Sequence, residues 1–166
     1  MKVTPETMRD KAMGLFADDF YCAQAILAVG LDMIGEKERD NALRAMAGMT
    51  GGCYRGDLCG AIAGAAQAVG CLFGAASLDE MEDARLASTV RLVYDRLKGK
   101  AVKEYGDTTC QTISNCNWYD MDDVKARKKD GRRDECTRFV GECAKVLGEV
   151  LLEVVGEEEL NILQGD

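Results

Sequence analysis

Eight cysteines and a complete absence of histidine give this sequence its most distinctive chemistry. Without histidine, the chain cannot form a Cys/His zinc site, a His-ligated haem or a nucleophile activated by a histidine base. The sequence also lacks a C-x-x-C-H haem attachment signal, a C-x-x-C pair of the thioredoxin kind and a recognisable nucleotide-binding motif. Any chemistry of the sulfurs must therefore come from the cysteines acting with one another.

Four of the cysteines closely follow residues that are typical of helix N-caps. Cys22 lies three residues after Asp19, and Cys59, Cys110 and Cys136 lie two residues after Asp57, Thr108 and Asp134. The first turn of a helix has unpaired N–H groups and the positive end of the helix dipole, and both stabilise a sulfur anion. The nearby carboxylates Asp57, Asp134 and Glu135 act in the opposite direction, so the sequence leaves the sign of the pKa shift open.

The elements that carry these cysteines are predicted to be helices, because only one proline is present and no alternating β-branched segment occurs. Capping residues and helical spacing predict helices at about 5–17, from Asp18 or Asp19 to Gly35, at 36–47 and at 57–76. An S-x-x-E box at Ser77 predicts the start of a further helix, at 77–105. A short helix is predicted from Thr108 and a long one from Asp134. Residues 117–131 are predicted to form a loop. We expect an all-α antiparallel bundle of about six to seven helices in a single domain, 1–166, with the four cysteines at one end.

An uncharged run from Leu58 to Leu78 is long enough to cross a bilayer. It consists mostly of glycine and alanine and lacks basic flanks and aromatic belts, so we predict a buried helix and no membrane span. Gly60 and Gly64 are four residues apart, as are Gly70 and Gly74, and each pair allows a close approach of another backbone. These Gly/Ala faces also offer a surface for a homo-oligomer.

The charge pattern restricts the partners. A net charge of -8 argues against nucleic acid, which needs a basic face. The basic stretch 125–133 is diluted by five neighbouring acids and is interpreted as solvated. The N-terminus has no signal-peptide pattern, so we expect a cytoplasmic protein, in which structural disulfides are rare.

The other four cysteines have different surroundings. Cys71 and Cys143 fall on apolar faces within helices and are predicted to pack in the core. The sequence leaves open whether Cys53 and Cys116 reach the rim of the four-cysteine site. Trp118 and Tyr119 follow the short helix and either shield the site or close the core.

The stretch CGAIAG at 59–64, preceded by CAQAIL at 22–27 and followed by Cys110 and Cys136, resembles the C_GCAxxG_C_C family of redox-active proteins. The resemblance covers about residues 15–145. It implies that Cys22, Cys59, Cys110 and Cys136 perform redox work or hold an iron–sulfur centre. The chain departs from the family pattern before Cys22, which follows Asp-Phe-Tyr, and after Cys110, where it reads QTISN.

Four converging thiolates would repel one another strongly, so they must be protonated, paired as disulfides or bound to metal. The first hypothesis is a [2Fe-2S] or [4Fe-4S] cluster held by these four cysteines, which would transfer electrons to an unidentified redox partner protein. The second is a thiol–disulfide protein with Cys59 as the attacking thiolate and one of the other three cysteines as its partner. A structural zinc ion held by the same four ligands ranks third, and a helical protein with inert buried thiols is the remaining alternative. Whether the protein is an enzyme is left open.

Overall fold

The chain folds into nine α-helices within residues 2–165, the part that this computed structural model describes. They are α1 (Pro5–Ala17), α2 (Cys22–Met33), α3 (Asp40–Met46), α4 (Gly60–Phe73), α5 (Leu86–Tyr105), α6 (Cys110–Ser114), α7 (Met121–Arg127), α8 (Arg132–Val155) and α9 (Glu157–Gln164). In the same residues, pairing of the β type is limited to one isolated bridge between Leu58 and Thr109. The all-α prediction is confirmed. No helix in the described range is long and apolar enough to cross a membrane.

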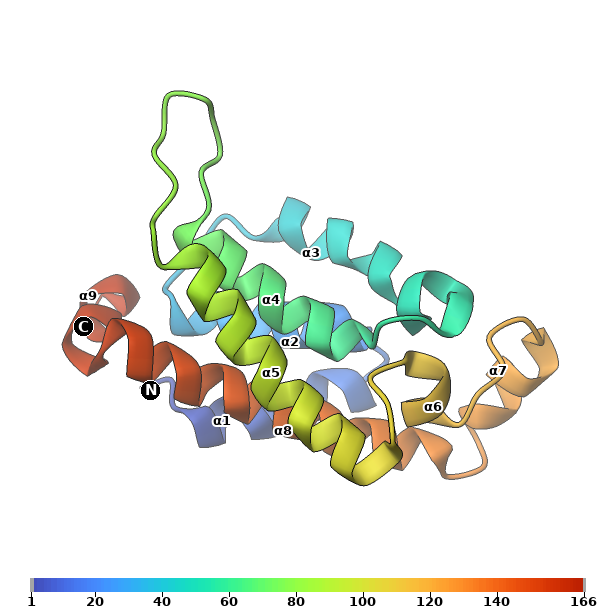
Figure 1. The fold of residues 1–166 in the computed structure, drawn as a ribbon. Helices are drawn as coiled ribbons and strands as arrows, with labels where there is room; N and C mark the ends of the chain where they lie inside the picture. Colours follow the sequence, from blue (N-terminus) through green and yellow to red (C-terminus); the bar gives the residue numbers. More distant parts are fainter. Residues whose placement is uncertain (1, 166) are drawn as a thin grey trace.

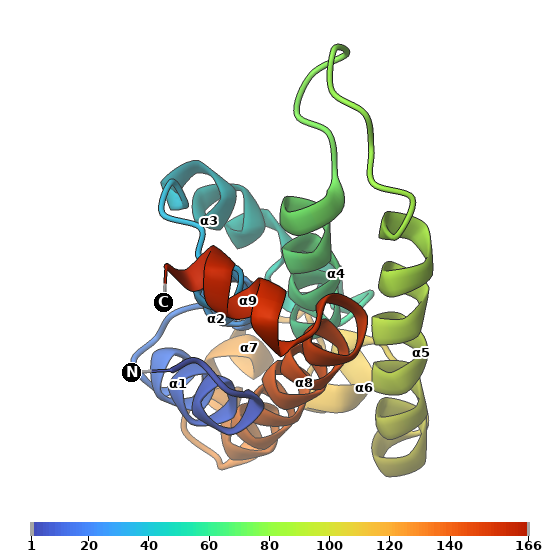
Figure 2. The ribbon, with the colours of Figure 1, turned by 90° about the vertical axis from the view of Figure 1, so that its left-hand side faces the viewer.

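Helix α2 lies at the centre of the bundle (Figure 1). It packs against α1, α4 and α8, and α5 covers α4 and α8 from the side, as the view in Figure 2 shows. Ten of the twelve residues of α2 are buried, as are nine of the fourteen in α4. The glycine- and alanine-rich helix is therefore a buried element of the bundle, as its composition predicts.

The contact between α2 and α4 depends on two glycines. A Cβ atom on Gly64 would lie 2.5 Å from the carbonyl oxygen of Ala23, and one on Gly60 would lie 2.9 Å from the Cys22 sulfur. Close approach is thus confirmed for the pair Gly60 and Gly64, and this face is occupied within the chain itself. Gly70 has open space where a Cβ would stand, so the second predicted pair does not form such a contact.

Residues 74–85 form a loop that projects from the bundle, although the sequence pattern predicts a helix from Ser77 (Figures 1 and 2). The Glu80 carboxylate accepts a hydrogen bond from the backbone N–H of Ala76, which makes a local turn. Leu78 and Met81 are fully exposed, so a helix here would have no buried face. Because most helical stability in proteins comes from packing, α5 begins only at Leu86, where the buried stripe begins.

Several predicted helix boundaries are also wrong. Helix α2 begins at Cys22 because Asp19 has a positive φ of 69°, and α8 begins at Arg132 after Gly131 with a φ of 89°. Helix α7 replaces a predicted loop, since the Asp120 carboxylate accepts hydrogen bonds from the N–H groups of its first turn. Helix α3 begins at Asp40, α4 follows Cys59, the cap of α6 is Thr109, and α9 was not predicted.

Candidate functional site

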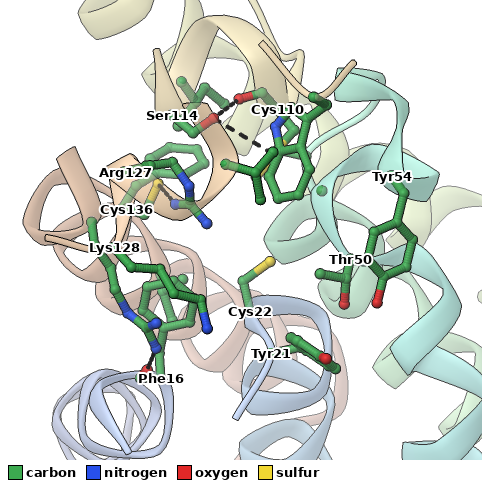
Figure 3. A pocket seen from close by; sticks show the side chains of 18 of the residues that line it. Phe16, Tyr21, Cys22, Thr50, Tyr54, Cys110, Ser114, Arg127, Lys128 and Cys136 are labelled. Carbon is green, nitrogen blue, oxygen red and sulfur yellow. Dashed lines mark hydrogen bonds between the residues drawn. The ribbon is translucent and has the colours of Figure 1, made fainter. Parts of the chain in front are cut away.

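The four cysteines selected from the sequence line one cavity of about 210 Å³. Figure 3 shows the Cys22 sulfur directed into the middle of this space, with Cys110 and Cys136 on other walls. We call it the sulfur cavity. Cys59 and Cys110 are buried, whereas Cys22 and Cys136 are partly exposed. The cavity thus brings together the four residues that the cap pattern selected.

Each cysteine has its own position relative to a helix start. Cys22 is the first residue of α2, Cys110 is the first residue of α6, and Cys59 is the N-cap of α4. Cys136 is the fifth residue of α8, one turn further in than predicted, because the helix begins at Arg132. Three of the sulfurs therefore lie at helix starts, and the fourth reaches the cavity from the second turn.

A short backbone bridge places Cys59 beside Cys110. The N–H of Cys59 donates to the carbonyl oxygen of Thr108 at 3.0 Å, and the N–H of Cys110 donates to that of Asp57 at 2.6 Å. These two bonds tie the entry of α4 to the entry of α6. The sequence gives no signal for this bridge, since a strand pattern needs several alternating residues.

Burial governs the acidity of the four thiols. Burial raises the pKa of Cys22 to about 11 and that of Cys110 to about 12, and it raises the pKa values of Cys59 and Cys136 as well. Negative charge on Cys22 would raise the pKa values of both Cys59 and Cys110 further. The N–H groups of Ala23 and Ala61 act in the opposite direction with a smaller effect. All four thiols are consequently protonated at neutral pH, and desolvation outweighs the helix starts.

Arg127 contributes a positive charge that sequence reasoning missed. Its Nη1 donates a hydrogen bond to the Cys136 sulfur at 3.4 Å, and its guanidinium lies 5.3 Å from the centre of the Trp118 ring. This interaction lowers the pKa of Cys136, although burial has the larger effect. Only 9% of Arg127 is exposed, so the interpretation of 125–133 as a solvated stretch is wrong at this residue. The position of Arg127 at the end of an unpredicted helix, α7, explains the miss.

The burial of the remaining four cysteines differs in part from the sequence prediction. Cys143 is buried in the core as predicted, but Cys71 is exposed, because its side of α4 has no helix packed over it. Cys116 is buried in a small cluster with Cys110 and Trp118. Cys53 is exposed and does not line the sulfur cavity, and all eight cysteines are free thiols.

The two aromatic residues after α6 also separate. Trp118 is buried and lines the sulfur cavity, whereas Tyr119 is 68% exposed. The Tyr54 ring packs edge-on against Trp118, with 6.4 Å between the ring centres, and also lines the cavity. Trp118 therefore closes one wall of the site, and Tyr119 does not shield it.

The grouping of the possible ligand side chains bears on metal binding. Within residues 2–165, no three side chains of His, Cys, Asp or Glu lie close enough together to hold one metal ion. A tetrahedral zinc ion needs its four sulfurs around one point, with Zn–S bonds of about 2.3 Å, so the arrangement gives the zinc hypothesis no support. Four thiols around a cavity of about 210 Å³ have the donor chemistry of an iron–sulfur cluster, which is larger than a single ion.

Comparisons with known proteins bear on the whole chain. Neither the curated proteins nor the solved structures contain a significant match. A family model described as "Putative redox-active protein (C_GCAxxG_C_C)" matches residues 20–150, a range that contains all four cavity cysteines. The chain belongs to the C_GCAxxG_C_C family of redox-active proteins.

Proposed function

We propose that this protein is an electron-transfer protein in which Cys22, Cys59, Cys110 and Cys136 hold an iron–sulfur cluster. The observation that carries the proposal is the position of all four thiols on one cavity. When bound, such a cluster supplies one-electron transfer. Assignment to a redox-active family supports the same class of chemistry.

The protein's own groups would favour negative charge at the sulfurs. Metal ligation requires thiolates, and a site with four thiolates carries a net negative charge. Arg127 donates a hydrogen bond to Cys136, and it forms no ion pair with any carboxylate in the described part of the chain. A buried cation without a carboxylate is stabilised when the sulfurs beside it are charged. Arg127 therefore supports ligation through Cys136.

The raised pKa values give this proposal a pH dependence. Each thiol is protonated at neutral pH and must lose its proton when it becomes a ligand. Binding of the metal centre therefore releases protons and becomes more favourable as the pH rises. Trp118 and the edge-on Tyr54 limit the access of water to the same cavity.

The visible absorption spectrum, together with the iron and acid-labile sulfide content of protein purified without oxygen, tests the proposal. We expect broad visible bands with stoichiometric iron and sulfide. The variant Cys22→Ala should lose them, whereas Cys71→Ser should keep them because Cys71 is an exposed cysteine on α4 outside the cavity. A colourless protein that takes up no cluster on reconstitution would contradict the proposal, as would Cys22→Ala protein with full iron content.

A second candidate, thiol–disulfide exchange, is favoured by the partial exposure of Cys22 and Cys136, which line the same cavity. Cys136 becomes the better attacking thiol than Cys59, because it is accessible and receives the Arg127 hydrogen bond. The Cys136 thiolate would attack a disulfide of a partner protein and form a mixed disulfide, releasing one partner thiolate. The Cys22 thiolate would then attack the Cys136 sulfur and release the second. The net change oxidises the pair Cys22 and Cys136 and reduces the partner.

Thiol counts before and after reduction test this second candidate. Aerobically oxidised protein should gain two thiols on reduction, and Cys136→Ala protein should gain none. A Cys53→Ser control should still gain two, because Cys53 lies outside the cavity. An unchanged count in the parent protein would reject this candidate.

A further inference from the structure

Buried polar atoms without hydrogen-bond partners gather around the sulfur cavity. Within residues 2–165, four buried side-chain atoms lack a partner: Oγ1 of Thr50, Oγ1 of Thr89, Nε1 of Trp118 and Nε of Arg127. Thr50, Trp118 and Arg127 line the sulfur cavity, and each is less than 10% exposed. The Thr50 hydroxyl lies within reach of the Tyr54 hydroxyl, so Trp118 and Arg127 are the two cavity residues that still need an acceptor. An unsatisfied buried polar group is costly to the folded state, so the concentration of such groups at one cavity indicates that something is bound there.

Arg127 is the most informative of these residues. Its Nη1 is used by the Cys136 sulfur, but its Nε has no acceptor, and no carboxylate in residues 2–165 lies within ion-pair distance of it. Figure 3 shows its guanidinium extending from α7 past Cys136 toward the centre of the cavity. Nε and the adjacent terminal nitrogen form the edge of a guanidinium that binds two oxygens of one anion side by side.

Trp118, which also lines the cavity, adds a second unpartnered donor. Its indole N–H can only donate, and the guanidinium of Arg127 lies over its ring. Both unpartnered groups thus require an acceptor, and one of them carries a positive charge. Water could accept both hydrogen bonds, but it could not neutralise a buried cation. An anion with at least two acceptor oxygens satisfies both requirements.

We propose that the sulfur cavity contains a binding site for a small oxyanion, held by Arg127 and Trp118 beside the cysteines. A cavity of about 210 Å³ admits an anion of a few heavy atoms, such as a short carboxylate or an inorganic oxyanion. A water molecule occupies about 30 Å³ in the liquid, so the anion does not need to fill the space alone. The site stands on the two donors, neither of which is a sulfur ligand, and it goes beyond electron transfer.

The fluorescence of Trp118 provides a direct test, because it is the only tryptophan in the chain. We would titrate anaerobically purified protein with sodium acetate and with sodium sulfate, keeping the ionic strength constant with sodium chloride. We expect a saturable change with acetate, with sulfate or with both, and none with chloride alone. Preference for one of the two identifies the source as a carboxylate or an inorganic oxyanion. The absence of saturation with both probes overturns the proposal.

Substitutions locate the site. Arg127→Leu should weaken binding by tenfold or more, and Arg127→Lys by about fivefold, since lysine keeps the charge but lacks the two-pronged edge. Lys128→Met is the matched control, because it removes one positive charge from the same cavity wall without removing an unpartnered donor; less than a threefold change is expected. Equal weakening by Arg127→Leu and Lys128→Met would mean non-specific attraction and overturn the proposal.

Two further measurements keep the result unambiguous. Titration calorimetry repeats each affinity, because Arg127→Leu also alters the surroundings of the Trp118 ring, and circular dichroism checks that each variant is folded. The iron and sulfide content is measured on the same samples. A protein that holds a cluster but binds neither anion overturns the oxyanion site alone, and a protein that binds an anion without iron overturns only the cluster.

Discussion

The contact between α2 and α4 and the sulfur cavity beside it share these two helices but are packed in opposite ways, and α6, α7 and α8 also line the cavity. Along the contact, Gly64 leaves so little room that a Cβ would meet the Ala23 carbonyl oxygen at 2.5 Å. At the cavity, the helices begin with Cys22 and, at the N-cap, Cys59, and about 210 Å³ is left open. The unpartnered donors Trp118 and Arg127 also belong to the cavity. The contact stabilises the folded protein, whereas the unpartnered polar groups of the cavity lower its stability.

Gly60 lies on the boundary between the two regions. A Cβ there would stand 2.9 Å from the Cys22 sulfur and 3.0 Å from the Met49 carbonyl oxygen. The glycine therefore allows the start of α4 to approach Cys22. The two glycines of CGAIAG thus have separate tasks, since Gly60 makes room for a sulfur and Gly64 makes room for a backbone.

The largest expected effect comes from filling the helix contact. Gly64→Ala should lower the free energy of unfolding by about 2–3 kcal/mol, because overpacking against backbone forces the helices apart. Gly70→Ala is the matched control on α4, since nothing lies within 4 Å of its Cβ position, and it should raise stability by about 0.5–1 kcal/mol. Urea unfolding of both variants measures the difference. Equal stability of the two would show that the contact is not tightly packed.

The cavity should show itself in the pH dependence of the reduced, metal-free protein. The pKa of Cys22 is raised to about 11 and that of Cys110 to about 12, above the ordinary value of 9.0, so the unfolded chain loses these protons at lower pH than the folded chain does. This contribution to stability is complete below pH 9 and declines as the pH rises toward the folded pKa values. We expect a loss of about 2 kcal/mol between pH 9 and pH 10, about 1 kcal/mol from each of the two thiols.

Two variants separate the cavity thiols from other groups that titrate in this range. Urea unfolding at several pH values should show a smaller decline in Cys22→Ala protein than in the parent. Cys53→Ser removes a thiol outside the cavity and should keep the decline of the parent. A decline that is the same in all three proteins would mean that lysines or tyrosines, and not the cavity, cause it.

The comparison also explains which features could be predicted from the sequence. The buried helix α4 follows from local composition, and the gathering of the four cysteines at one end of the bundle follows from the antiparallel order of the helices. Residues that act through non-local contacts were missed. The bridge between Leu58 and Thr109 involves segments far apart in the chain, and Arg127 looked like one charge among many in a basic stretch.

In the loop 74–85, the sequence pattern predicts a helix that does not form. Its S-x-x-E box has the local pattern of a helix start, and Glu80 does bond to a nearby backbone N–H. A capping pattern nevertheless cannot make a helix where no apolar residue finds a surface to pack on. Local signals therefore predicted the elements with a buried face correctly and failed where tertiary contacts decide.

The smallest predicted effect concerns the turn that borders the cavity. Four consecutive residues, Gly51, Gly52, Cys53 and Tyr54, have φ values between 57° and 61°. A left-handed conformation costs a residue with a Cβ about 1–2 kcal/mol. Glycine avoids this cost at the first two positions, whereas Cys53 and Tyr54 do not.

Cys53→Gly should therefore raise the free energy of unfolding by up to about 1 kcal/mol, less the entropy that glycine adds to the unfolded chain. Tyr54→Gly relieves the same strain but removes the edge-on contact with Trp118, which is worth about 0.5–1.5 kcal/mol, so it should give no gain. Urea unfolding compares the two variants. Greater stability of Cys53→Gly than of Tyr54→Gly would mean that packing on the cavity wall holds a strained turn in place. The reverse order would show that backbone strain does not govern the stability of this turn.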